Sequence, residues 1–145
     1  MIETVRRICA DLASEAPTAK VVGERLGTIV DPGSDVTPLL VTPADRDFAE
    51  ASIVREPGTD EPAYVALVPA EHAAPSVEDL RSTFGDYVAV PRIHWNTPRR
   101  IIFHPPTTGT THTCAIVVDV RPGPGGVEDG TALVVTVRRD VRLDQ

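Results

Sequence analysis

Residues 112–139, which read HTCAIVVDVRPGPGGVEDGTALVVTVRR, indicate the fold class more clearly than any other stretch of the chain. Segment 112–120 is almost continuously apolar, as is typical of a strand at the centre of a sheet. In segment 131–139 the side chains alternate between two faces, only one of which is uniformly apolar. The intervening PGPGG (122–126) leads into no helix, so we interpret it as a loop between strands and not as a phosphate-binding turn. The pattern favours an antiparallel sheet.

Further strands are predicted from short apolar runs bounded by Pro, Gly and Asp. These runs cover residues 39–42, 47–55, 63–68, 87–93 and 99–104.

Three helices are predicted from apolar residues at helical spacing. The first lies before Pro17, with its apolar stripe at Ile2, Val5, Ile8, Cys9 and Leu12. The second runs from a Thr18 cap to Leu26 and stops at Gly27. The third begins at a Ser76 cap, presents Val77, Leu80 and Phe84, and ends at Gly85.

We therefore predict an α+β fold in which helices pack on a mainly antiparallel sheet of about six to seven strands. Its length favours a single domain spanning 1–145. A weak internal similarity suggests two pseudo-repeat halves, 18–69 and 76–139, each with one helix and three strands.

The net charge of −7 belongs entirely to the middle third of the chain. Between residues 31 and 75, nine acidic side chains are offset only by Arg46 and Arg55, whereas opposite charges balance in 1–30 and 76–145. Residues 6–27 have the rhythm of a helix-turn-helix, but their four basic and three acidic side chains leave a net charge of only +1. Because a nucleic-acid-binding protein needs a basic face, we predict no nucleic-acid partner.

The two cysteines, Cys9 and Cys114, form no CxxC pair, so thioredoxin-type and zinc chemistry are not indicated. Both lie in apolar patterns, and we predict two buried free thiols. The N-terminus is charged throughout and lacks the apolar region of a signal peptide. No stretch approaches the ~18 apolar residues of a membrane span. We therefore predict a cytoplasmic protein without a membrane partner.

A candidate binding surface lies in residues 91–106, which read PRIHWNTPRRIIFHPP. Arginine can stack on an indole or form paired hydrogen bonds with a carboxylate, and Trp and Arg are enriched at binding hot spots. Since a tryptophan buries a large apolar area, core packing is the first expectation for Trp95, and binding is the alternative. The candidate binding residues are Arg92, His94, Trp95, Arg99, Arg100 and His104.

Metal and catalytic chemistry find little support in the sequence. A hairpin could place His104 opposite His112, but zinc needs a third ligand, and no spacing supplies one. No GxSxG turn, activated cysteine or cofactor fingerprint is present. We predict no metal, no cofactor and no catalytic residue.

Two functions remain open at this level. The first is a non-catalytic protein-interaction module, such as an inhibitor, immunity protein, chaperone or accessory subunit, whose 91–106 hairpin contacts a protein partner or another copy. The alternative is a small enzyme or ligand-binding protein with a pocket around His94, Trp95 and His104.

Overall fold

The computed structural model describes residues 1–92, 94–107 and 111–142. Its strands form one antiparallel sheet of eight strands in the order β1-β2-β3-β4-β8-β7-β6-β5. The first strand after α2, β1, and the first strand after α3, β5, are therefore the two edges of the sheet. The strands are β1 Gly27–Asp31, β2 Leu39–Pro43, β3 Phe48–Arg55, β4 Pro62–Pro69, β5 Tyr87–Val90, β6 Arg99–Phe103, β7 His112–Gly123 and β8 Gly126–Val141.

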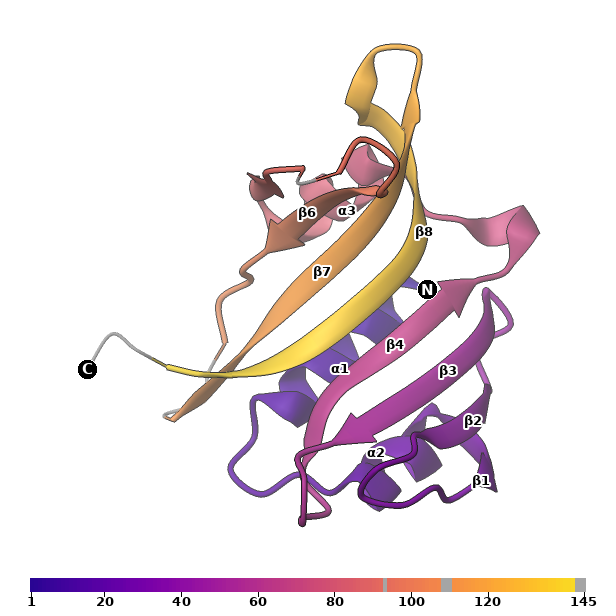
Figure 1. Ribbon diagram of the computed structural model, residues 1–145, viewed down its shortest axis with the longest axis vertical. Helices are drawn as coiled ribbons and strands as arrows, with labels where there is room; N and C mark the ends of the chain where they lie inside the picture. Colours follow the sequence, from indigo (N-terminus) through magenta and orange to yellow (C-terminus); the bar gives the residue numbers. More distant parts are fainter. Residues whose placement is uncertain (93, 108–110, 143–145) are drawn as a thin grey trace.

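Three helices cover one face of this sheet, and Figure 1 views the molecule from the other face. Helix α1 (Ile2–Leu12) contacts β7 and β8, α2 (Ala19–Leu26) contacts β1 and β2, and α3 (Val77–Phe84) contacts β8. A short 3-10 turn, Glu71–Ala73, precedes α3. The predicted packing of the third helix on an antiparallel sheet is confirmed.

Helix boundaries follow the predicted capping residues. The Thr18 hydroxyl accepts a hydrogen bond from the Val21 N–H at 3.2 Å, and the Ser76 hydroxyl accepts one from the Asp79 N–H at 3.0 Å. Each bond satisfies a backbone donor that the first turn of a helix leaves without a partner. Gly85, with φ of 90°, ends α3 in a conformation that favours glycine.

The predicted strand count and three-strand repeat need correction. The sheet has eight strands, because Gly27, predicted only as a helix stop, also begins β1. Consequently α2 and α3 are each followed by four strands. The 112–120 and 131–139 segments are longer than predicted and extend into a hairpin where Gly123 pairs with Gly126. In contrast, β5 ends at Val90, three residues early.

The core lies between the helices and one face of the sheet. Along β4, the buried side chains Val65 and Leu67 alternate with Tyr64 and Ala66, which face away from the helices. The register places one such outward residue from each of seven strands side by side. This cross-strand row is Leu40, Ser52, Ala66, Thr136, Val117, Ile102 and Val88. We call the uncovered side of the sheet the open face.

The prediction of two free thiols is wrong, because Cys9 of α1 and Cys114 of β7 form a disulfide with a Cα–Cα distance of 5.4 Å. Sequence patterns correctly placed both residues in the apolar interior, where Cys9 is 5% and Cys114 1% exposed. The patterns could not show that α1 packs directly on β7. This packing brings together two residues separated by 105 positions.

A second anchor of α1 is the guanidinium of Arg139 on β8, whose side chain is only 6% exposed. Its Nε donates to the Leu12 carbonyl at 2.9 Å, and its Nη2 donates to the carbonyls of Ser14 and Glu15 at 3.2 and 3.3 Å. The first of these carbonyls belongs to the last residue of α1 and the other two follow it, so no helical N–H reaches them. A positive charge at this end also interacts favourably with the negative end of the helix dipole.

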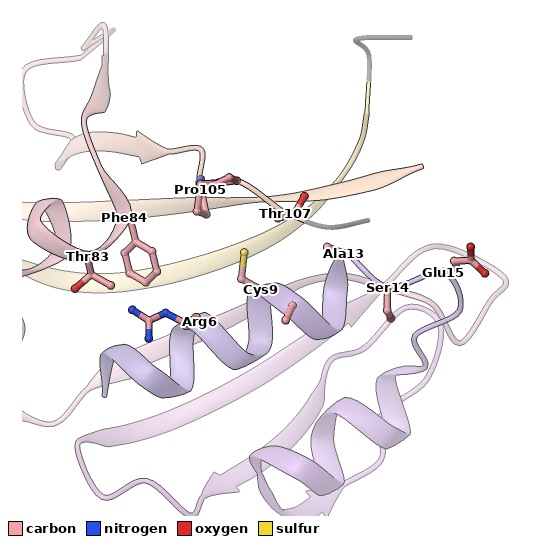
Figure 2. A pocket seen from close by; sticks show the side chains of 11 residues that line it. Arg6, Cys9, Ala13, Ser14, Glu15, Thr83, Phe84, Pro105 and Thr107 are labelled. Carbon is pink, nitrogen blue, oxygen red and sulfur yellow. The ribbon is translucent and has the colours of Figure 1, made fainter. Parts of the chain in front are cut away.

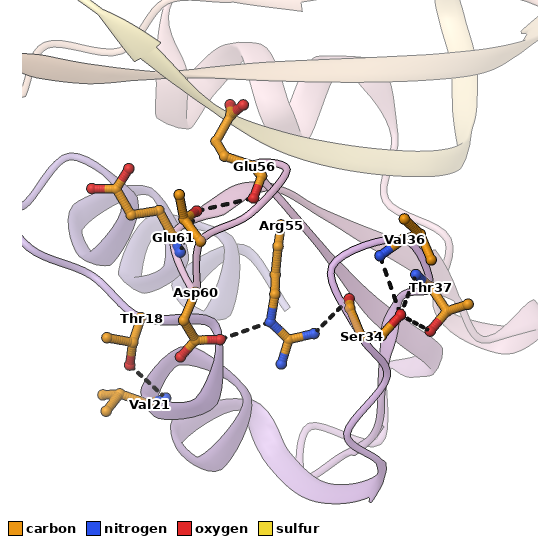
Figure 3. A network of polar contacts seen from close by, with 10 residues as sticks. Thr18, Val21, Ser34, Val36, Thr37, Arg55, Glu56, Asp60 and Glu61 are labelled. Carbon is orange, nitrogen blue, oxygen red and sulfur yellow. Dashed lines mark hydrogen bonds and ion pairs between the residues drawn. The ribbon is translucent and has the colours of Figure 1, made fainter.

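The end of the sheet near α2 is held by a polar network around Arg55 (Figure 3). Its guanidinium donates to Asp60 Oδ1 at 2.7 Å and to the Ser34 carbonyl at 3.2 Å, thereby tying the β3–β4 turn to the β1–β2 loop. The Asp60 carbonyl in turn accepts from the Ala19 N–H at 2.7 Å. Arg55 is therefore a structural arginine.

The carboxylate of Asp45, between β2 and β3, contacts the start of α1 and makes stability depend on pH. Burial alone would raise the pKa of Asp45, but hydrogen bonds from the Thr4 hydroxyl and the Asp47 N–H, together with the Met1 ammonium, lower it below its ordinary value of 3.8. A lowered pKa stabilises the fold above the unfolded-state pKa, and that stabilisation is lost as pH falls through the folded-state pKa.

We expect Asp45→Asn to make the free energy of unfolding less dependent on pH below about 4, because the variant cannot take up this proton. Urea unfolding at a series of acidic pH values measures this slope. A slope equal to that of the unsubstituted protein would contradict the assignment.

Among the residues that the structure describes, no helix has the length and apolarity needed to cross a membrane.

Candidate functional site

The predicted binding residues gather mainly around the connection between β5 and β6. Strand β5 is the edge of the sheet, and residues 91–98 join it to β6. Within this connection the His94 carbonyl accepts hydrogen bonds from the Thr97 N–H at 3.1 Å and the Thr97 hydroxyl at 2.6 Å. The connection therefore contains a defined turn that carries His94 and Trp95.

Trp95 is 85% exposed, so the expectation that it packs in the core is wrong. The aromatic packing is made instead by Phe84, Tyr87 and Phe103, with ring centroids 6.2 Å apart for Phe84–Phe103 and 5.6 Å for Tyr87–Phe103. The sequence pattern could not separate these roles, because all four aromatic residues occur near one another. The turn between His94 and Thr97 carries Trp95 away from that cluster.

The three arginines of the region have different surroundings. Arg100 on the open face donates from Nε to Asp119 Oδ1 at 2.8 Å, and this hydrogen bond raises its pKa further. Arg92 and Arg99 are exposed and join no ion pair within the described residues. We call Arg92, His94, Trp95 and Arg99 the hairpin surface. Its two free guanidinium groups are available for an external carboxylate.

The histidines of the predicted pocket are not brought together. His94 precedes β6 and His104 follows it, so they lie at opposite ends of a five-residue strand, about 16 Å long. His104 is exposed and lines a shallow depression of about 400 Å³ with Thr113 and Asp140. That depression contains neither His94 nor Trp95.

His104 and His112 are not opposite one another either. The register pairs Phe103 with Ile116, whereas His112 pairs with Val141 on β8. Within residues 1–92, 94–107 and 111–142, no three His, Cys, Asp or Glu side chains come close enough to hold a metal ion.

A larger pocket of about 530 Å³ lies between α1, the end of α3 and residues 105–107 (Figure 2). Its wall is mainly apolar, with Ala13, Phe84 and Pro105 among the lining residues, and the sulfur of Cys9 also lines it. Arg6 lies within α1 and Glu15 follows its C-terminal end, but Arg6 already pairs with Glu3 at 2.7 Å. This lining suits an apolar group better than acid–base chemistry.

Sequence reasoning missed this pocket, since its residues come from three distant segments and carry no motif. It also missed the open face as a surface. The alternation along 131–139 was the available signal, because its second face contains Val134 and Thr136 and is not strongly charged.

Comparisons of the chain with protein-family models, curated proteins and solved structures find no match.

Proposed function

We propose that this protein is a non-catalytic interaction module that binds an acidic segment of a protein partner through the hairpin surface. The observation that carries the proposal is the 85% exposure of Trp95, the only tryptophan of the chain. A large apolar ring in water gains free energy when a partner covers it, and Trp and Arg are enriched where binding energy concentrates.

The charges around Trp95 support an acidic partner. Residues 87–104 contain three arginines and two histidines but no carboxylate. Two of these arginines, Arg92 and Arg99, have no intramolecular carboxylate to compete with that of a partner among the described residues. Charge complementarity of this kind speeds association and discriminates against wrong partners.

The same surface offers little support for catalysis. His94 and His104 are separated by the length of β6, and Arg6 and Glu15, the charged side chains that line the pocket beside Cys9 among the described residues, form no ion pair with each other. An interaction protein of the inhibitor, immunity, chaperone or accessory-subunit type therefore remains the proposal.

A second candidate function is binding of a small apolar ligand, which the pocket of about 530 Å³ favours because ligand sites usually have about 300–1,000 Å³. Ala13→Phe should fill part of this pocket and abolish binding of a fluorescent apolar dye. Binding that is unaffected by Ala13→Phe would argue against this site.

We propose that the protein resides in an oxidising cellular compartment, because it contains a disulfide. Disulfides persist in oxidising environments and are uncommon in the cytosol, so Cys9–Cys114 supports an oxidising compartment and opposes the cytoplasmic prediction. Free thiols can be alkylated in intact cells with a reagent that slows migration on a gel. Gel mobility then distinguishes an oxidising compartment from the cytosol. A protein with two free thiols in the cell would contradict the oxidising compartment.

We expect an aromatic photo-crosslinking residue at position 95, which keeps a large apolar ring in place of the indole, to form a discrete adduct with one partner in the source cells. Val36 provides a matched control, because it is 86% exposed in the β1–β2 loop, within the acidic third of the chain. The adduct at position 95 should disappear in Arg92→Ala with Arg99→Ala, since binding needs these guanidinium groups.

These substitutions should leave the fold intact, because exposed side chains contribute within about 0.5 kcal/mol to stability. Arg55→Ala is the contrasting variant, since it removes the bonds to Asp60 and Ser34 and should lower stability. Identical adducts at positions 95 and 36, or adducts unaffected by the double variant, would contradict the proposal.

A further inference from the structure

The open face is a large sheet surface with little charge available to water. Its apolar side chains include Val88, Ile102, Val117 and Leu40 in the cross-strand row, with Tyr64 beside them. Three of these are substantially exposed: Val88 at 60%, Leu40 at 39% and Tyr64 at 37%. An antiparallel sheet facing water normally presents mainly polar residues, so this face is unusually apolar.

The charges of the open face are largely neutralised within the chain. Arg100 pairs with Asp119 at 2.8 Å, and Arg138 pairs with Asp140 at 2.7 Å. Glu50 on β3 also points to this face, and it takes part in no ion pair among the described residues. Among the described residues, a partner surface therefore meets two ion pairs, the Glu50 carboxylate and, toward the β7–β8 turn, the exposed Arg121.

The face has the dimensions of a protein interface. Eight strands spaced by about 4.8 Å span about 38 Å, and five residues along a strand span about 17 Å. These two lengths give a flat area of about 650 Å², to which projecting side chains add further surface. This area is similar to the ~800 Å² that each partner contributes to a standard interface.

We infer that the open face packs against the open face of a second copy, related by a two-fold axis parallel to the strands. This axis places the β1–β4 half of one copy over the β5–β8 half of the other. Residues 31–75 carry −7, whereas residues 76–145 are neutral, so this arrangement keeps the two acidic segments apart. An axis across the strands would stack them directly and would be opposed by like-charge repulsion.

The sheet order makes this arrangement specific at the level of side chains. β2 and β6 are second from opposite edges, and β3 and β7 are third, so Leu40 lies over the partner copy's Ile102 and Ser52 over its Val117. Glu50 is two residues from the row on β3. Arg100 on β6 and Asp119 on β7 are also two residues from the row, on the same side of it. Glu50 of one copy thus lies over Asp119 of the other, whose charge is neutralised by Arg100 on the neighbouring strand. Two aligned sheets pack about 10 Å apart in this way.

Sedimentation velocity over a concentration series tests the inference. We expect the unsubstituted protein to be a dimer at about 100 µM and to dissociate at lower concentration. Leu40→Arg and Val117→Arg should each weaken dimerisation at least tenfold, because each buries a charge in the interface. Val36→Arg is the matched control and should have no effect, since Val36 lies in a loop outside the sheet.

The orientation has its own test. Glu50→Arg should strengthen the dimer by placing an arginine over the partner copy's Asp119, and adding Asp119→Arg should reverse this gain by placing arginines together. A monomer at about 100 µM, or a dimer indifferent to both Leu40→Arg and Val117→Arg, would overturn the inference. Because Leu40 is already partly exposed, near-unchanged thermal stability of Leu40→Arg would show that a monomeric variant is still folded. Trp95→Ala should leave the dimer intact, which separates this interface from the hairpin surface.

Discussion

Reduction of the Cys9–Cys114 disulfide should lower the free energy of unfolding by about 3–5 kcal/mol, because the bond closes a loop of about 100 residues. Closing so long a loop restricts the unfolded chain more than a short loop would. In the folded protein, the same bond fastens α1 to the interior strand β7. The midpoint of thermal unfolding should fall by about 10–20 °C.

Thermal unfolding with and without a dithiol reductant measures this effect. The reductant supplies two electrons and two protons, leaving two protein thiols and a cyclic disulfide of the reductant. Cys9→Ala with Cys114→Ala is the control: it should unfold at the lower temperature in both conditions and should not respond to reductant. Equal unfolding temperatures for the oxidised and reduced protein would contradict the assigned role.

Arg139→Ala should destabilise the protein by about 3 kcal/mol, because it leaves the carbonyls of Leu12, Ser14 and Glu15 without their charged donor. The side chain is almost fully buried, so water cannot easily take its place. Urea unfolding measures the loss. Arg139→Lys should recover only part of it, since an ammonium group lacks the planar fork that reaches several carbonyls.

The neighbouring arginine provides a matched control. Arg138 precedes Arg139 on β8 but points to the open face, where it pairs with Asp140. Arg138→Ala should change stability by about 0–1 kcal/mol, as expected for an exposed ion pair. If both alanine variants lost similar stability, the anchoring of α1 by Arg139 would be refuted.

Much of the fold could be predicted from local patterns. Thr18 and Ser76 cap their helices as expected, and alternation along 131–139 correctly indicated a strand with two unlike faces. β1 was missed because its five residues directly follow α2, so Gly27 was interpreted only as a helix stop. Short strands are recognised mainly by their neighbours, and β1 depends on pairing with β2.

The surfaces were harder to predict, because they depend on which segments meet. Periodicity could place Cys9 and Cys114 in the interior, but only the packing of α1 on β7 joins them. Likewise, the stretch 91–106 contained both the candidate site and part of the core. Phe103 lies in the core while Trp95 lies outside it, and no spacing rule distinguishes them.

Fluorescence quenching of Trp95 tests the proposed binding role most directly, because the emission comes from a single side chain. In the free protein, a soluble quencher such as acrylamide should reach the ring nearly as easily as free indole, and emission should be that of indole in water. In the non-covalent complex of the unsubstituted protein with the partner identified by crosslinking, and after the partner's own emission is subtracted, Trp95 emission should shift to shorter wavelength and its quenching should fall severalfold. A ring already shielded in the free protein, or quenched equally in the complex, would contradict the hairpin surface as the binding site.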